Sequence, residues 1–262
     1  MHLDPIVQTA RVAAAKAAGI LRFYYENRPQ IRKKGIKDLV TQADIESESA
    51  IIEVIQKRFP DHSILAEESG LSANTSENRW VIDPLDGTTN FAHGLPLFAV
   101  SIAFQHNGVT QLGMVANPIS GETFRAVAGQ GAYLNDNKIA VSDTSKMVDS
   151  LLVTGFPYDI NANPGTLLER FNRLLLAAQA VRRLGSAALD LCFVACGRFD
   201  VYWNAALLHP WDFAAGMLLI TEAGGRVSRV DGDEIDLQPG TVAASNGRLH
   251  DALLHELEES QS

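Results

Sequence analysis

The chain has 262 residues, 46% of them hydrophobic, with 22 Lys and Arg residues against 31 Asp and Glu residues, for a net charge of −9. Such a chain can bury a substantial core, and its acidic balance argues against nucleic-acid binding as a main role. No apolar stretch approaches the roughly 20 residues of a membrane span, and no signal-peptide apolar region precedes Ile6, so we expect a cytoplasmic protein without membrane contact.

The first half of the chain reads as two helices followed by short strands. Apolar residues at three- and four-residue spacings predict amphipathic helices, and short apolar runs bounded by turn sequences predict strands. The helices are expected at residues 4–27 and 44–59, and the strands at residues 64–66 and 80–82. From residue 100 to 134, short β-rich runs separated by Asn, Gly and Pro turns predict an antiparallel meander.

In the second half, helix and strand patterns alternate. Strands are expected at residues 151–153, 181–184 and 199–203, and helices at residues 166–180, 187–196 and 211–223. Gly224 and Gly225 are expected to end the last helix. Because no linker or internal repeat divides the chain, we predict a single domain over residues 1–262, with approximate halves at 1–145 and 146–262. The mixture of elements indicates an α/β or α+β fold.

Motifs for several other chemistries are missing from the sequence. Cys192 and Cys196 fall on one face of a predicted helix, which favours core packing over a disulfide or a zinc site. The seven histidines have no metal-ligand spacing, and the chain has neither a P-loop nor a complete dinucleotide fingerprint. No organic cofactor is therefore expected.

Two acidic residues follow the predicted strand at residues 80–82. Asp83 and Asp86 would point to opposite faces of a plain strand, but Pro84 fixes its own φ and Gly87 permits a turn that brings both carboxylates toward one point. Such a cluster is unfavourable unless it is protonated or neutralised by a cation. Oxygen ligands suit Mg²⁺ or Mn²⁺ better than zinc. The alternative is an ordinary surface turn, since Asp-Pro and Asp-Gly are common turn dipeptides.

Other acids fall at comparable positions. Glu67 and Glu68 end the predicted strand at residues 64–66, which weakens the surface-turn interpretation. Asp212 follows Pro210, where an acid also interacts favourably with the dipole of the helix that begins there. Thr88 and Asp44 could each be a simple helix N-cap.

Four ordered blocks of the sequence resemble the inositol monophosphatase family of Mg²⁺-dependent, lithium-sensitive phosphomonoesterases, and its bacterial branch in particular. The segment from Asp83 to Phe91 matches the family signature Asp-Pro-(Ile/Leu)-Asp-Gly-Thr-x-Asn-Phe completely. The other blocks are residues 37–44, 66–69 and 210–216, the last followed by 222–225. The resemblance implies a layered αβαβα sandwich with metals at the junction between the halves, and a homodimer.

The resemblance also implies a set of metal ligands. A first Mg²⁺ would be held by Glu67, Asp83 and the backbone carbonyl of Leu85, and a second by Asp83, Asp86 and Asp212. A third, weaker site would use Glu67 with waters, and Mn²⁺ is a possible substitute.

The implied reaction is in-line attack of a metal-activated water on phosphorus, without a phosphoenzyme. Thr88, paired with Asp44, would orient the water and help to deprotonate it, with Glu67 assisting through the metal. Lys37 would lie near the metal cluster. Glu68 would support it by holding Lys37 or a backbone amide. Gly87 and Thr88 are expected to open a helix whose free N–H groups seat the phosphate.

Substrate contacts are implied less completely. The family contacts substrate hydroxyls through the segment that is here Gly185, Ser186 and Ala187, together with the phosphate-side residues Asp86, Gly87, Thr88 and Asp212. It also uses a glutamate seven residues before the last metal aspartate. That position is Ala205 here, or Asn204 if this loop has a one-residue insertion. An amide or a methyl group would then replace a carboxylate and weaken selection for inositol.

The sequence thus predicts a Mg²⁺-dependent hydrolase of a small phosphomonoester, with inositol 1-phosphate as the first candidate. Fructose 1,6-bisphosphate, histidinol phosphate and the 2′-phosphate of NADP are alternative substrates. A non-catalytic binding scaffold is the alternative of a different class, and the complete set of acidic residues argues against it.

Overall fold

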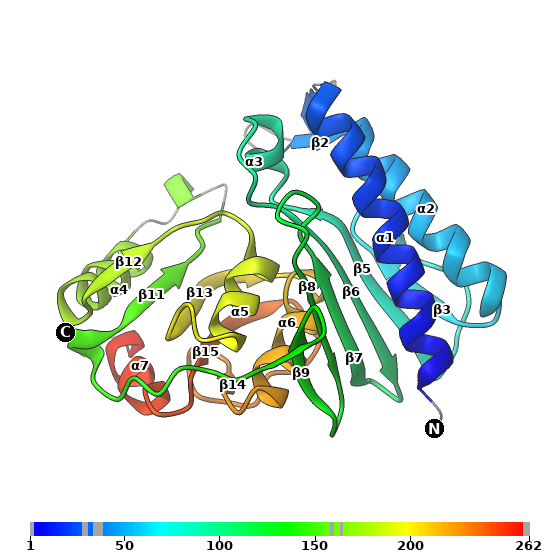
Figure 1. Cartoon of the computed structure of the whole chain (residues 1–262). Helices are drawn as coiled ribbons and strands as arrows, with labels where there is room; N and C mark the ends of the chain where they lie inside the picture. The colour runs from blue at the N-terminus through cyan, green and yellow to red at the C-terminus, as the bar shows by residue number, and fades with distance from the viewer. Residues whose placement is uncertain (1–2, 28–30, 34–38, 158–159, 163–164, 259–262) are drawn as a thin grey trace.

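The computed structural model describes residues 3–27, 31–33, 39–157, 160–162 and 165–258. It has five layers, in which pairs of helices alternate with two large sheets (Figure 1). The expected αβαβα sandwich is confirmed. None of the described helices is both long and apolar enough to cross a membrane.

The eight-stranded sheet is covered on one face by helices α1 (Asp4–Asn27) and α2 (Gln42–Arg58). Its strand order is β10-β9-β8-β7-β6-β5-β3-β4, and all neighbours are antiparallel except β3 and β5. The strands are β3 (Ser63–Ala66), β4 (Gly70–Leu71), β5 (Asn78–Asp86), β6 (Ala99–His106), β7 (Val109–Ala116), β8 (Thr123–Val127), β9 (Gly131–Leu134) and β10 (Asn137–Ile139). The meander expected at residues 100–134 is therefore present as β6 to β9. A separate hairpin consists of β1 (Ile31–Lys33) and β2 (Leu39–Thr41).

The five-stranded sheet has the order β12-β11-β13-β15-β14. Its strands are β11 (Leu151–Thr154), β12 (Ala180–Arg182), β13 (Val201–Leu208), β14 (Arg226–Ser228) and β15 (Gly240–Ser245). Strand β11 is parallel to both β12 and β13. Helices α5 (Ala187–Ala195) and α6 (Pro210–Glu222) lie between the two large sheets, and α4 (Gly165–Ala177) and α7 (His250–Leu257) cover the outer face of the smaller one (Figure 1).

Three apolar cores fill the spaces between these layers. The first core lies between α1, α2 and the large sheet, the central core surrounds α5 and α6, and the third core lies under α4 and α7. In β5, Trp80 and Ile82 face the first core and Val81 faces the central core. A strand that is buried on both faces reads as a continuous apolar run, which is why the sequence indicated it clearly.

Several predicted boundaries were wrong. Helix α2 begins at Gln42, so Asp44 lies in its first turn and is not its N-cap. Strand β5 does not end at residue 82 but continues to Asp86, and β13 continues to Leu208. Helix α4 ends at Ala177 instead of residue 180, and β12 ends at Arg182 instead of residue 184. Strands β14 and β15 and helix α7 were not predicted.

Candidate active site

Four carboxyl groups from three parts of the chain come together beside the end of β5. Asp83 is buried, and its pKa is raised well above the ordinary value by burial and then by the charges of Glu67, Asp86 and Asp212. Glu67 follows β3, Asp86 ends β5, and Asp212 lies in the first turn of α6. We call these four residues the acidic cluster.

A bulge in β5 directs Asp83 and Asp86 to the same place. Asp83 pairs with Ser101 and Asp86 pairs with Ala99, so β5 takes three steps where β6 takes two. One extra residue reverses the side-chain alternation, so residues three apart share a face. The backbone N–H of Leu85 donates a 2.9 Å hydrogen bond to Oδ1 of Asp83. The predicted convergence is therefore produced inside the strand and not by a turn after it.

Asp86 is held by the start of α5. Oγ of Ser186 and the backbone N–H of Ala188 donate hydrogen bonds of 2.6 and 2.7 Å to its Oδ2. Burial raises the pKa of Asp86 to about 6, although these hydrogen bonds lower it. Ser186 is also the N-cap of α5 and accepts a hydrogen bond from the N–H of Leu189. Its hydroxyl thus connects the helix start to the acidic cluster.

Asp212 caps the start of α6 and also belongs to the acidic cluster. Its Oδ2 accepts a 2.7 Å hydrogen bond from the N–H of His209, where α6 begins. Burial and the charge of Asp86 raise its pKa to about 7. Helix capping therefore accounts for one oxygen of Asp212, and the other oxygen remains available to the cluster.

Thr88 and Asp44 form the expected pair. Oγ1 of Thr88 lies 3.3 Å from Oδ1 of Asp44 and 3.1 Å from the carbonyl oxygen of Leu85, and the Thr88 and Asp44 side chains are buried. Gly87, with φ of +95°, precedes the single-turn helix α3 (Thr88–Ala92) and is its N-cap. Gly87 and Thr88 do open a helix, as predicted, but it is short.

The turn that carries Glu67 is attached to α2 by a residue that the sequence did not reveal. Glu48 is buried, and its Oε2 accepts a 2.8 Å hydrogen bond from the N–H of Glu68. The N–H of Glu67 donates to the carbonyl oxygen of Ile82 in β5. Lys37, expected near the cluster, lies outside the described residues. Glu48 recurs on the same helical face as Asp44 and Ile51, and this spacing is the only signal that could have indicated it.

Asn90 joins α3 to the segment that precedes α5. Its Nδ2 donates hydrogen bonds of 2.7 Å to the carbonyl oxygens of Leu97 and Leu184. Gly185 follows with φ of +90°, and a Cβ atom there would lie 3.1 Å from the Asn90 side chain. Gly185, Ser186 and Ala187 are thereby brought beside α3 and the acidic cluster.

Asn204 and Ala205, the two candidate positions for a contact with substrate hydroxyls, lie on opposite faces of the smaller sheet. In β13, Tyr202 belongs to the central core and Trp203 to the third core, so alternation turns Asn204 toward the central core. Ala205 packs against the third core, on the opposite face of the sheet. From Asn204 to Leu208 the pairing is irregular, because β13 takes four steps where β15 takes two.

Comparison with known proteins shows which family the chain belongs to. The sequence profile of the inositol monophosphatase family matches residues 2–262. The chain belongs to the inositol monophosphatase family. Membership makes it a phosphomonoester hydrolase of a family that is generally metal-dependent.

Its relatives have names of two kinds. The chain is 48% identical to an inositol-1-monophosphatase of Synechocystis sp. over 226 residues, which are 86% of this chain and 78% of the relative. It is 42% identical to the Nus factor SuhB of Pasteurella multocida over 259 residues, 98% of this chain and 97% of the relative. The crystal structure of the extragenic suppressor protein suhB from Bartonella henselae has a TM-score of 0.94 at 36% identity, covering 98% of this chain and 100% of that chain.

The donor set of the acidic cluster fits a hard divalent cation. Its donor atoms are all oxygens, and burial raises the pKa values of Asp83, Asp86 and Asp212, so a nearby cation would favour their charged forms. In the described parts of the chain, no three Asp, Glu, His or Cys side chains are already arranged as a metal-ligand group. Cation binding would therefore require small movements of carboxylates that now accept backbone hydrogen bonds.

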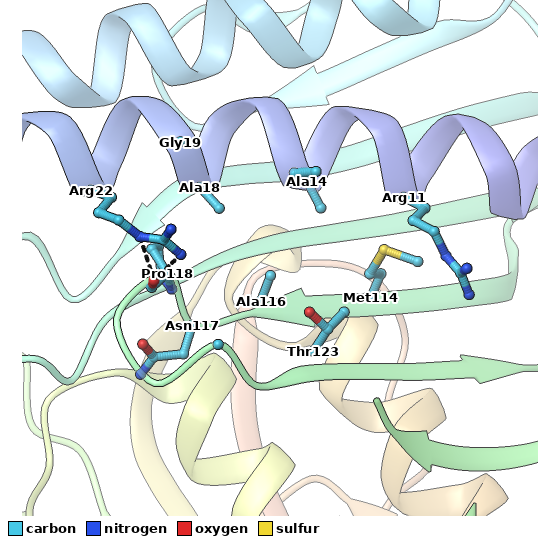
Figure 2. Close-up of a pocket in the computed structure, with 12 residues that line it drawn as sticks. Arg11, Ala14, Ala18, Gly19, Arg22, Met114, Ala116, Asn117, Pro118 and Thr123 are labelled. Carbon is cyan, nitrogen blue, oxygen red and sulfur yellow. Dashed lines mark hydrogen bonds between the residues drawn. The ribbon is translucent and has the colours of Figure 1, made fainter. Parts of the chain in front are cut away.

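A cavity of about 280 Å³ lies elsewhere, between α1 and strands β7 and β8 (Figure 2). Two of its polar side chains, Arg22 and Asn117, serve the fold. Arg22 donates two hydrogen bonds to the carbonyl oxygen of Pro118, and Asn117 binds the carbonyl of Pro96 and the N–H groups of Ile119 and Ser120. The acidic cluster is therefore the candidate active site of this member of the inositol monophosphatase family.

Proposed function

We propose that the chain is a Mg²⁺-dependent hydrolase of small phosphomonoesters that uses the acidic cluster, with inositol 1-phosphate as the first candidate substrate. The observation that carries the proposal is the meeting of Glu67, Asp83, Asp86 and Asp212 beside the Thr88–Asp44 pair. Cleavage would break the phosphorus–oxygen bond to the alcohol, form a bond from water oxygen to phosphorus, and release inorganic phosphate.

The four acids and the carbonyl oxygen of Leu85 would hold the ions. Bound Mg²⁺ would supply charge neutralisation at the phosphoryl group and acidification of a water molecule. The carbonyl oxygen of Leu85 faces Thr88, since the two oxygens are 3.1 Å apart. This oxygen is therefore next to the residue proposed to orient the water.

Thr88 and Asp44 would act on the proton of the attacking water. When the Thr88 hydroxyl donates its hydrogen to Asp44, the lone pairs of Oγ1 can accept a hydrogen bond from a water molecule. The buried carboxylate of Asp44 would thus orient Thr88 as an acceptor. Ser186 and Ala188 hold Asp86, and the N–H of His209 holds Asp212, which limits the movement of both acids.

Phosphate release from inositol 1-phosphate, with Mg²⁺ and with EDTA, tests the proposal. We expect activity with Mg²⁺, little or none with EDTA, and inhibition by lithium. Asp83→Asn should lower kcat by at least ~10³, equivalent to about 4 kcal/mol in the barrier. Its thermal midpoint in EDTA should hold or rise, because one of four crowded acids is removed. Full turnover in EDTA would contradict the proposed mechanism.

Asp200 provides a matched control for Asp83. It is also buried, but it lies outside the cluster and accepts hydrogen bonds from Oγ of Ser142 and the N–H of Leu151. Asp200→Asn should lower the thermal midpoint and leave kcat within a fewfold of the native value. If Asp83→Asn behaves in the same way, Asp83 has a structural role.

Asn204 supports a broader substrate range than inositol 1-phosphate alone. A neutral amide forms weaker hydrogen bonds with hydroxyls than a carboxylate does. We therefore expect a raised KM for inositol 1-phosphate and a modest advantage over simple aryl phosphates. Fructose 1,6-bisphosphate, histidinol phosphate and NADP belong in the same kcat/KM panel.

A binding role is the second candidate function, because a relative that spans almost the whole chain is named a Nus factor. Absence of phosphate release from every phosphomonoester in the panel, at saturating Mg²⁺, would favour this role over catalysis. We also propose a homodimer. Sedimentation at the mass of one chain at micromolar concentration would contradict it.

A further inference from the structure

Arg183 lies at the edge of the five-stranded sheet beside the acidic cluster. The proposed reaction does not use its positive charge. Strands β12, β11 and β13 are mutually parallel, so their carboxyl ends lie at one edge (Figure 1). The residue pairs Val153–Arg182 and Thr154–Trp203 place Arg183, Gly155 and Asn204 just beyond the last paired positions. Ligands of open sheets with parallel strands bind outside this edge.

Arg183 lies against the segment assigned to substrate binding. A Cβ atom on Gly185 would be 3.3 Å from Nη1 of Arg183, and a Cβ atom on Gly87 would be 3.3 Å from the carbonyl oxygen of Gly185. The guanidinium therefore lies close to Gly185, whose carbonyl oxygen lies close to Gly87, the residue that follows Asp86. This places the Arg183 side chain on the same side of the molecule as the acidic cluster.

The Arg183 guanidinium is available to a ligand. Its side chain is exposed, and it takes part in no hydrogen bond or ion pair with another described residue. Its charge lowers the pKa of Asp190 in α5, but burial and the charge of Asp86 raise that pKa well above the ordinary value. Asp190 is buried, so it does not cover the outer side of the guanidinium.

Asn204 favours the binding of an anionic group because its side chain is uncharged. Its side chain lies against Gly155, since Nδ2 would be 2.9 Å from a Cβ atom there, and its Oδ1 accepts a hydrogen bond from the N–H of Ala206. A glutamate at this position would repel an anionic leaving group. With Asn204, no carboxylate at this position offsets the charge of the exposed Arg183.

We propose that Arg183 binds a second anionic group on the leaving-group side of the substrate, and that the enzyme therefore prefers phosphomonoesters that carry another phosphate or carboxylate. This inference rests on the proposed function. A hydrogen bond between Arg183 and a second anionic group would stabilise the bound substrate. A hydrogen bond of this charged kind is worth roughly ten- to a hundredfold in kcat/KM.

Two substrates that differ only in the second phosphate test the inference. We expect kcat/KM with Mg²⁺ to be at least about tenfold higher for fructose 1,6-bisphosphate than for fructose 1-phosphate, mainly through KM. Arg183→Gln should remove this advantage and leave turnover of fructose 1-phosphate within threefold, and Arg183→Lys should retain part of it.

The neighbouring Arg182 is the matched control. It is also exposed, and its Nη1 donates to the carbonyl oxygen of Val181. Arg182→Gln should keep the ratio between the two substrates. Equal kcat/KM values for both fructose phosphates, or a ratio unchanged in Arg183→Gln, would overturn the inference. Failure of the native enzyme to hydrolyse any phosphomonoester would instead overturn the proposed function.

Discussion

Oδ2 of Asp86 accepts a 2.6 Å hydrogen bond from Oγ of Ser186, a residue 100 positions later in the chain. This bond joins the end of β5 in the large sheet to the start of α5 in the central layer. One hydroxyl therefore caps a helix and holds a proposed metal ligand.

Replacing Ser186 should affect stability and catalysis together. Ser186→Ala removes an N-cap, which costs about 1 kcal/mol, and removes one of the two hydrogen bonds that hold Oδ2 of Asp86. We expect a lower thermal midpoint and at least a tenfold lower kcat/KM at limiting Mg²⁺. Ser186→Thr keeps the hydroxyl and should recover most of both losses. If Ser186→Ala loses stability and keeps full activity, the hydroxyl serves the helix alone.

In the metal-free protein, the contribution of Asp86 and Asp212 to folding stability should fall as pH rises from about 4 to about 7. Burial raises the folded-state pKa of Asp86 to about 6 and that of Asp212 to about 7, from 3.8. Between about pH 4 and 7 the folded state therefore binds more protons at these groups than the unfolded state does, and their contribution to stability falls with rising pH. The test is the difference in thermal midpoint, in EDTA, between the native protein and an Asp86→Asn/Asp212→Asn double variant. This difference should decrease as the pH is raised from 5 to 8.

The double variant also controls for histidine titration. Burial lowers the pKa of His250 to about 4, so this residue favours folding at higher pH in both proteins, and its effect cancels in the difference. Mg²⁺ should raise the native midpoint more at pH 8 than at pH 5 and have little effect on the variant. A native midpoint that rises with pH relative to the variant would contradict the raised pKa values.

The two candidate positions for the substrate-facing acid can be separated. Asn204→Glu places a carboxylate toward the central core, and we expect it to improve inositol 1-phosphate over an aryl phosphate about tenfold in kcat/KM. Ala205→Glu would bury a charge against the third core, so it should lower the thermal midpoint without changing this ratio. A change of ratio in Ala205→Glu alone would show that the side chains on this part of β13 face the opposite way.

Gly87 and Gly94 both have positive φ but should tolerate alanine very differently. A Cβ atom on Gly87 would lie 2.9 Å from the carbonyl oxygen of Leu97, and its φ is +95°. Gly94 has φ of +74° with no atom within 4 Å of such a Cβ atom. Gly94→Ala should cost roughly 1–2 kcal/mol of unfolding free energy for its backbone conformation, and Gly87→Ala should cost clearly more and reduce activity. Denaturant unfolding of both variants gives the comparison, and equal losses would contradict the close packing around Gly87.

Much of the fold could be predicted from the sequence because its signals are local. The three- and four-residue spacing from Asp4 to Asn27 gave α1 with its observed bounds, and the apolar run at residues 80–82 gave the centre of β5. Strands β14 and β15 and helix α7 escaped prediction. They are short, and β14 and β15 are stabilised by pairing with each other and with β13, which leaves little periodic pattern in their own residues.

By itself, the sequence determined which chemistry the chain carries, since the acids, the glycines and Thr88 occur in one ordered set of blocks. The tertiary structure decided where those groups lie. The pairing of β5 with β6 puts Asp83 and Asp86 on one face, and the position of β13 in its sheet turns Asn204 toward the central core and Ala205 toward the third core. The contact of Arg183 with Gly185 likewise depends on the packing of α3 against the segment before α5. Strand register and long-range packing are set by partners far along the chain, so no local pattern encodes them.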